Sequence, residues 1–127
     1  MKNEDSLFNV AMYVIRNCLI VSVQVELHDK VILNIQKDIL RKVNEREIKG
    51  VIIDVSMVGL MDSFIVKTIS NTAEMLSLLG AKTVLIGLKP GIVAAFVDLD
   101  LEFKGAKFAL NVEEGLSLLK CTSLHEI

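Results

Sequence analysis

An aspartate and a serine at the start of a predicted helix are the residues of this chain best suited to chemistry. The stretch 51–67, VIIDVSMVGLMDSFIVK, is typical of a buried strand through Asp54, a glycine-containing loop, and a helix that begins at Asp62 and Ser63. Asp62 fits a helix N-cap, whose carboxylate accepts backbone N–H groups that the helix leaves unpaired. Ser63 could accept a phosphate, because a dianion at the first turn meets free N–H groups and the positive end of the helix dipole. The local sequence leaves both a plain helix cap and a phosphorylation site open.

The same residue types could form a nucleophilic triad, in which Ser63 would need a histidine base and a carboxylate. The candidates are His28 or His125 with Asp54 or Asp62. No GxSxG motif surrounds the serine, no oxyanion-hole motif is evident, and His125 lies in a predicted flexible tail. We therefore predict that the protein is not an enzyme and has no catalytic residues.

A phosphoaspartate receiver domain is another alternative, because Asp54 lies near the end of a central strand and Lys89 follows a later strand. Receiver domains also need an acidic pair after the first strand to hold Mg²⁺, whereas residues 14–17 of this chain are VIRN. Asp54 is therefore interpreted as a carboxylate that organises its loop.

Composition and charge narrow the function classes. The 127 residues are 52% hydrophobic and carry 14 basic against 16 acidic side chains, which predicts a single domain with a large core and disfavours nucleic acid. The longest uncharged stretch, residues 6–15, is far shorter than the roughly 20 residues that a bilayer span needs. No CxxC pair, zinc-spaced histidine or phosphate-binding glycine loop occurs. We expect a cytoplasmic protein that self-associates, with no cofactor or metal, no membrane contact, and reduced thiols at Cys18 and Cys121.

Hydrophobic periodicity predicts an α/β fold with a mixed sheet. An N-terminal hairpin is followed by strands and helices in alternation, and right-handed crossovers make the later strands parallel. The prediction is one domain over residues 1–127, with a core at about 8–120 and a flexible tail at 121–127. The predicted strands are 10–15, 18–25, 51–55, 83–87 and 107–110, and the predicted helices are 29–49, 63–79, 92–99 and 112–120.

Four segments, which together span nearly the whole chain, carry a family resemblance. They are NCLIVSVQVEL at 17–27, GVIIDVSMVGLMDSFIVK at 50–67, LLGAKTVLIGLKP at 78–90 and EEGLSLL at 113–119. The chain resembles STAS domains and, among them, the scaffold proteins of the stressosome. The most specific element is DSF at 62–64, which is similar to the site where a partner serine kinase phosphorylates its scaffold.

The resemblance implies a non-catalytic scaffold in bacterial stress signalling that binds a serine/threonine switch kinase and releases it when Ser63 is phosphorylated. It also implies co-assembly with sensor STAS paralogues in a large hetero-oligomer. Many such proteins carry a second phosphorylated threonine, and the matching residue here is Ala95, which puts a second site in doubt. The alternative with the same fold is an anti-anti-sigma factor that binds an anti-sigma factor directly. The expected partner-binding residues are Met57, Gly59, Leu60, Met61, Asp62 and Phe64.

Overall fold

Alternating apolar residues near the start of the chain form the predicted hairpin. The computed structural model describes residues 10–99 and 105–120, and its first element is β1 (Val10–Ile15). This strand pairs antiparallel with β2 (Cys18–Val23), and Arg16 adopts positive φ in the turn between them. The hairpin therefore supplies the antiparallel part of a mixed sheet.

Three parallel strands extend the sheet in the order in which they occur along the chain. β3 (Gly50–Asp54) pairs with β2, β4 (Lys82–Ile86) pairs with β3, and β5 (Ala106–Ala109) pairs with β4. The strand order is thus β1-β2-β3-β4-β5. Parallel neighbours need crossover connections, which the helices between the strands provide. The carboxyl ends of the four parallel strands consequently lie along one edge of the sheet.

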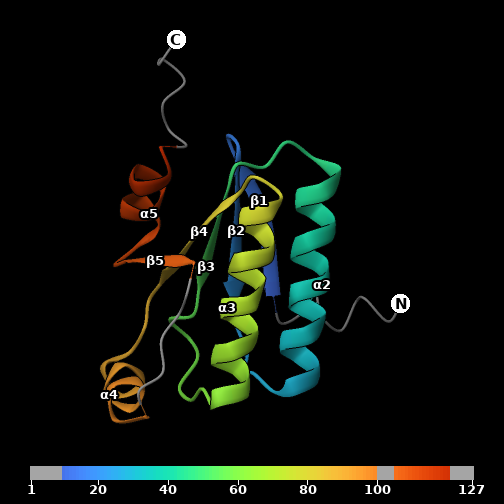
Figure 1. Cartoon of the computed structure of the whole chain (residues 1–127). Helices are drawn as coiled ribbons and strands as arrows, with labels where there is room; N and C mark the ends of the chain where they lie inside the picture. Colours follow the sequence, from blue (N-terminus) through green and yellow to red (C-terminus); the bar gives the residue numbers. More distant parts are fainter. Residues whose placement is uncertain (1–9, 100–104, 121–127) are drawn as a thin grey trace.

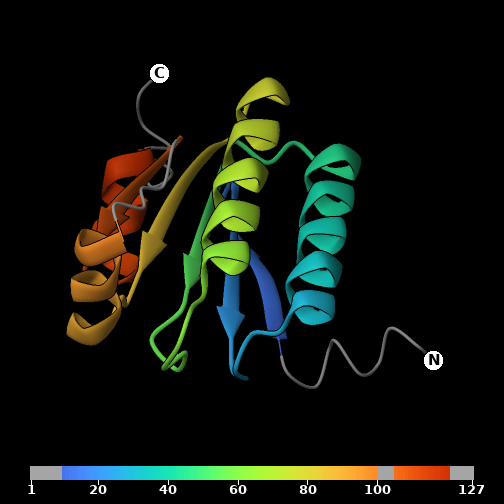
Figure 2. The same ribbon diagram turned by 60° about the horizontal axis from the view of Figure 1, so that its bottom comes forward.

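Helices cover both faces of this sheet (Figures 1 and 2). α2 (Asp29–Glu45) and α3 (Ser63–Leu78) lie side by side on one face, and α5 (Val112–Leu119) lies on the other. α4 (Pro90–Leu99) follows β4 and sits at the end of the sheet where the parallel strands finish. The apolar residues of α2 follow the 3, 4, 4 spacing expected of an amphipathic helix, and those buried are Ile32, Ile35, Ile39 and Val43.

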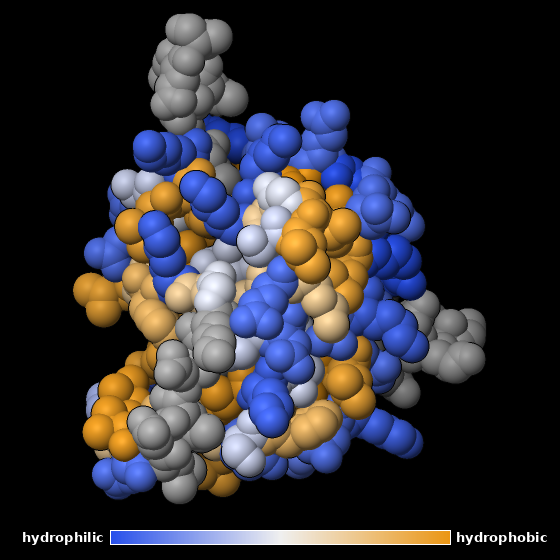
Figure 3. All heavy atoms as spheres, in the orientation of Figure 1, coloured by the Kyte–Doolittle hydropathy of each residue, from blue (hydrophilic) through white to orange (hydrophobic). Residues whose placement is uncertain are grey.

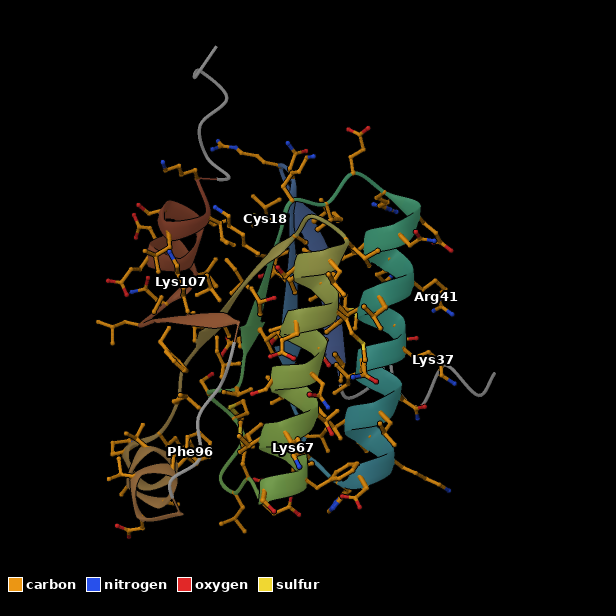
Figure 4. All side chains as sticks on the ribbon, in the orientation of Figure 1. Cys18, Lys37, Arg41, Lys67, Phe96 and Lys107 are labelled. Atoms are coloured by element: carbon orange, nitrogen blue, oxygen red, sulfur yellow. The ribbon has the colours of Figure 1, made fainter. Side chains whose placement is uncertain are left out.

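The sheet separates two apolar clusters. The larger lies between the sheet and the pair α2 and α3, and the smaller lies between the sheet and α5. Cys18, which Figure 4 labels, belongs to the smaller cluster and is fully buried. It is disulfide-bonded, so the prediction of a reduced thiol is wrong. The two cysteines are 103 positions apart in the sequence, so no local spacing pattern indicated a disulfide at Cys18. Cys121 itself and the predicted tail 121–127 lie outside the described residues.

The predicted element boundaries differ from the observed ones by a few residues at most. The largest differences are at β2, which ends at Val23, and at α2, which ends at Glu45. In the described part of the chain, none of the helices combines the length and the apolar character that a bilayer span requires.

Candidate functional site

The backbone at the start of α3 places Ser63 as the first helical residue, as predicted. Asp62 is the N-cap, and its Oδ1 accepts a hydrogen bond of 2.9 Å from the backbone N–H of Ile65. Ser63 is exposed, whereas Ile65 is buried in the larger cluster. The burial of Ile65 fixes the rotation of the helix, and this rotation turns the Ser63 hydroxyl towards solvent.

The loop that leads to this serine, residues 55–62, is here called the docking loop. Asp54 organises its first turn, since Oδ1 accepts a hydrogen bond of 2.9 Å from the N–H of Ser56. Val58 then donates its N–H to the carbonyl of Val55 at 2.9 Å, and its own side chain is fully buried. The interpretation of Asp54 as a loop-organising carboxylate is confirmed.

Glu26, in the connection between β2 and α2, holds the middle of the docking loop. Both carboxylate oxygens accept from the N–H of Gly59 at 3.1 Å, and Oε1 also accepts from the N–H of Leu60 at 3.4 Å. Sequence reasoning missed this residue. Glu26 lies 33 residues before Gly59, and no motif signals that the two loops meet at the same edge of the sheet.

The anchored loop divides its apolar side chains between the core and the surface. Met57 and Leu60 are exposed, the latter by 79%, and Phe64 on the first turn of α3 is 40% exposed. Met61 is half-buried and packs against the larger cluster. Of the six residues expected to contact a partner, the structure therefore exposes all except Met61.

Three other hydroxyl residues of α3, Thr68, Ser70 and Thr72, are much less accessible than Ser63. Thr68 and Ser70 are buried, and Thr72 is tied into the helix pair because Gln36 donates to its hydroxyl at 2.8 Å. Thr72 in turn donates to the backbone carbonyl of Thr68 at 2.7 Å. A kinase could not reach these buried groups without local opening of the fold, which for Thr72 means opening the contact between α2 and α3.

Charged residues flank the docking loop and the first turns of α3. Asp62 precedes Ser63 and Glu26 holds the docking loop, while Lys67 lies one helical turn further along α3 on an exposed position (Figure 4). Residues four apart share a helix face, so the Lys67 ammonium group is on the same side of α3 as the serine.

The geometry gives no support to a triad. His28 is the exposed N-cap residue of α2 and makes no side-chain capping bond, and it forms no hydrogen bond with Ser63. His125 falls outside the described ranges. Within residues 10–99 and 105–120, His, Cys, Asp and Glu side chains do not gather in groups of three that could hold a metal ion.

A curated protein of known sequence matches part of this chain. The YezB protein of Bacillus subtilis (strain 168), which is named as uncharacterized, is 32% identical over 59 residues, 46% of this chain. The match spans 60% of that protein's own length.

Solved structures give longer matches. A Moorella thermoacetica RsbS variant, with a glutamate in place of a serine, is 26% identical with a TM-score of 0.74, covering 87% of this chain and 94% of that one. A chain from the molecular architecture of the stressosome is 23% identical with a TM-score of 0.68, covering 89% and 98%. The anti-sigma factor antagonist SpoIIAA, in its unphosphorylated form, is 18% identical with a TM-score of 0.69, covering 87% and 96%.

A family model extends over most of the sequence. The model of the STAS domain matches residues 9–115, which include every described strand and the first turn of α5. Together with the mixed five-stranded sheet and the four helices of the described residues, this match shows that the chain belongs to the STAS domain family.

Proposed function

We propose that this protein is a non-catalytic stressosome scaffold and kinase antagonist, which binds a serine/threonine switch kinase and releases it when Ser63 is phosphorylated. The observation that carries the proposal is an exposed hydroxyl at the first residue of α3, next to a loop that presents Met57 and Leu60 to solvent. A kinase must reach the hydroxyl it modifies, and exposed apolar side chains, flexible methionine among them, suit a protein contact.

A phosphate at this position would change binding without unfolding the helix. It adds roughly −1.5 to −2 charges at pH 7. The free N–H groups of the first turn and the Lys67 ammonium group favour that charge. A docked partner, however, would have to remove water from the phosphate beside Met57 and Leu60, which costs free energy. The expected result is a folded protein that has lost affinity for its kinase.

The first test is site-specific phosphorylation by the cognate switch kinase, which we expect to be similar to RsbT. Wild-type protein, Ser63→Ala and Ser77→Ala are incubated with the kinase and Mg-ATP, and intact masses and modified sites are determined. Ser77 is the matched control, because it is an exposed serine near the last turn of the same helix. We expect one phosphate at Ser63 in the wild type and in Ser77→Ala, and none in Ser63→Ala. No phosphate on the wild type, or a phosphate elsewhere, contradicts the proposal.

The second test is the affinity of the unphosphorylated chain for the kinase. Ser63→Ala removes only a solvent-exposed hydroxyl, so it should bind as the wild type does and stay bound in the presence of ATP. Ser63→Asp introduces a negative charge that the N-terminus of a helix accepts, so it should fold and bind more weakly. Equal affinities for the two variants would refute the switch.

Assembly state separates this function from the alternative. The scaffold proposal is supported by the likeness to RsbS and to the stressosome chain, and it includes a large hetero-oligomer with RsbR-like sensor paralogues. The likeness to SpoIIAA favours the alternative, a small antagonist that binds an anti-sigma factor directly. Light scattering after mixing with a sensor paralogue distinguishes them: a large particle supports the scaffold, and an unchanged mass together with anti-sigma factor binding supports the alternative.

We place the protein in the cytoplasm, where a switch kinase meets its ATP. Disulfides are rare in that compartment. The Cys18 disulfide is therefore unusual for this location, and the redox state of Cys18, trapped by alkylation in cell extracts, tests the proposal: a free thiol supports the cytoplasm and a disulfide argues against it.

A further inference from the structure

A cleft of about 670 Å³ opens beside α4, just beyond the carboxyl ends of the parallel strands. Its deeper part includes Leu85 and Phe96, which are buried, and Figure 4 places Phe96 on α4 next to the sheet. Val93 on α4 and Phe108 on β5 also line it and are 45% and 49% exposed. Figure 3 shows apolar surface on α4 and above it, with the outline hollowed between them. The volume is in the range of natural binding sites, and the lining is largely apolar.

The lining carries two charged residues, Glu114 and Lys89, and of their side chains only that of Glu114 has a bonding partner among the described residues. Glu114 Oε1 accepts a hydrogen bond of 2.7 Å from the N–H of Leu110, so this carboxylate is committed to the start of α5. Lys89 is exposed and forms no ion pair with the residues that the structure describes. The cleft therefore combines a largely apolar surface with one carboxylate that is hydrogen-bonded to the backbone and one ammonium group that has no ion-pair partner among the described residues.

The cleft is continuous with the docking loop. Ser56 belongs to both, and the loop after β4 lies directly against it at Gly87. A Cβ atom on Gly87 would be 2.8 Å from Ser56 Cβ and 2.9 Å from its Cα and backbone nitrogen. The two loops therefore touch through their main chains. The surface of the docking loop therefore runs into the cleft at Ser56.

We propose that this cleft is a second part of the kinase-docking surface, and that it receives an apolar segment of the kinase with an acidic side chain that pairs with Lys89. The inference rests on the proposed function and extends its contact surface beyond the docking loop. The acidic group is inferred from the Lys89 ammonium group, which is unpaired among the described residues and favours a negative partner. The kinase is inferred as the partner because the cleft adjoins the docking loop at Ser56 and Gly87. The wall residue Leu110 is 81% exposed, which suits a protein segment laid across the cleft better than an enclosed small molecule.

Affinity measurements with two matched pairs of variants test this inference. Leu110→Ser is compared with Leu78→Ser, because Leu78 is 89% exposed at the far end of α3. Lys89→Glu is compared with Lys82→Glu, because Lys82 is exposed at the opposite end of β4. The dissociation constant for the purified, unphosphorylated switch kinase should rise about tenfold for each cleft variant and stay within about twofold for each control. The effect of Lys89→Glu should be larger at low salt.

The affinity of the wild-type protein for the kinase shows whether a negative result refutes the proposed function or only the role of the cleft. If the wild type does not bind the kinase, the proposed function and this inference are both wrong. If it binds, and the cleft variants match their controls, the docking loop stands and the cleft is not part of the surface. Circular dichroism of all four variants checks folding, and Lys89→Glu still decides the question if Leu110→Ser unfolds.

Discussion

Removal of the Glu26 carboxylate should loosen the docking loop while leaving the rest of the protein folded. In Glu26→Ala the N–H groups of Gly59 and Leu60 lose their acceptor, which lies 3.1 and 3.4 Å away in the wild type. A hydrogen bond to a charged group contributes about 1.5–3 kcal/mol. Because Glu26 is exposed and both distances exceed the ideal, we expect the loop-opening free energy to fall by about 1–2 kcal/mol. That corresponds to a rise of roughly 5- to 30-fold in the open population of the loop.

Amide hydrogen exchange measures this opening residue by residue. Exchange at Gly59 and Leu60 should accelerate by that factor in Glu26→Ala, while amides in β3 keep their rates. Glu26→Gln keeps one carbonyl acceptor without the charge, so it should fall between the wild type and Glu26→Ala. Glu47→Ala is the matched control, because Glu47 is also exposed and holds no loop. If the Gly59 amide exchanges at the wild-type rate in Glu26→Ala, the reasoning is refuted. Water would then accept the Gly59 N–H as well as the carboxylate does.

Two further predictions concern the stability of the fold, measured by urea denaturation. Gly87→Ala should cost roughly 2–5 kcal/mol, because positive φ strains any Cβ and this one would lie within 3 Å of Ser56. Gly80→Ala is its control, with similar φ but open space around the new Cβ, so it should cost only about 1–2 kcal/mol, and equal losses would contradict the clash. Thr83→Val should raise the free energy of unfolding by about 1 kcal/mol, because the buried Thr83 hydroxyl lacks a hydrogen-bond partner within the described residues. A destabilised Thr83→Val would show that this hydroxyl is satisfied.

Local patterns were sufficient wherever a short stretch of sequence decides the structure. The 3, 4, 4 spacing of Ile32, Ile35 and Ile39 with Val43 specifies one face of a helix, and that face is buried. The Asp62-Ser63 pair specifies a cap and a first helical residue, because the capping bond spans only three residues. The interpretation of Asp54 as a loop-organising residue followed from setting aside a receiver domain, and the bond that confirms it is also local, since Asp54 accepts from the N–H two residues later.

Long-range contacts could not be predicted in the same way. Glu26 meets Gly59 only because the crossover connections after β2 and β3 begin at the same edge of the sheet, and register decides which residues face each other. The contact of Gly87 with Ser56 arises from the spacing of β3 and β4, which leaves no room for a side chain between the two loops. Cys18 was misjudged for a related reason, because nothing in the sequence around it indicates the disulfide.

The order of the strands has a consequence for biosynthesis. Since each strand pairs with the one made just before it, the sheet can grow in the direction in which the ribosome delivers the chain. α2 and α3 cover their face as this happens, but the apolar side chains on the opposite face have to wait for α5. A nascent chain that has completed β4 therefore exposes an uncovered apolar surface around Ile20, Ile52 and Val84. A pause in translation before α5 would leave this surface open to chaperones or to aggregation.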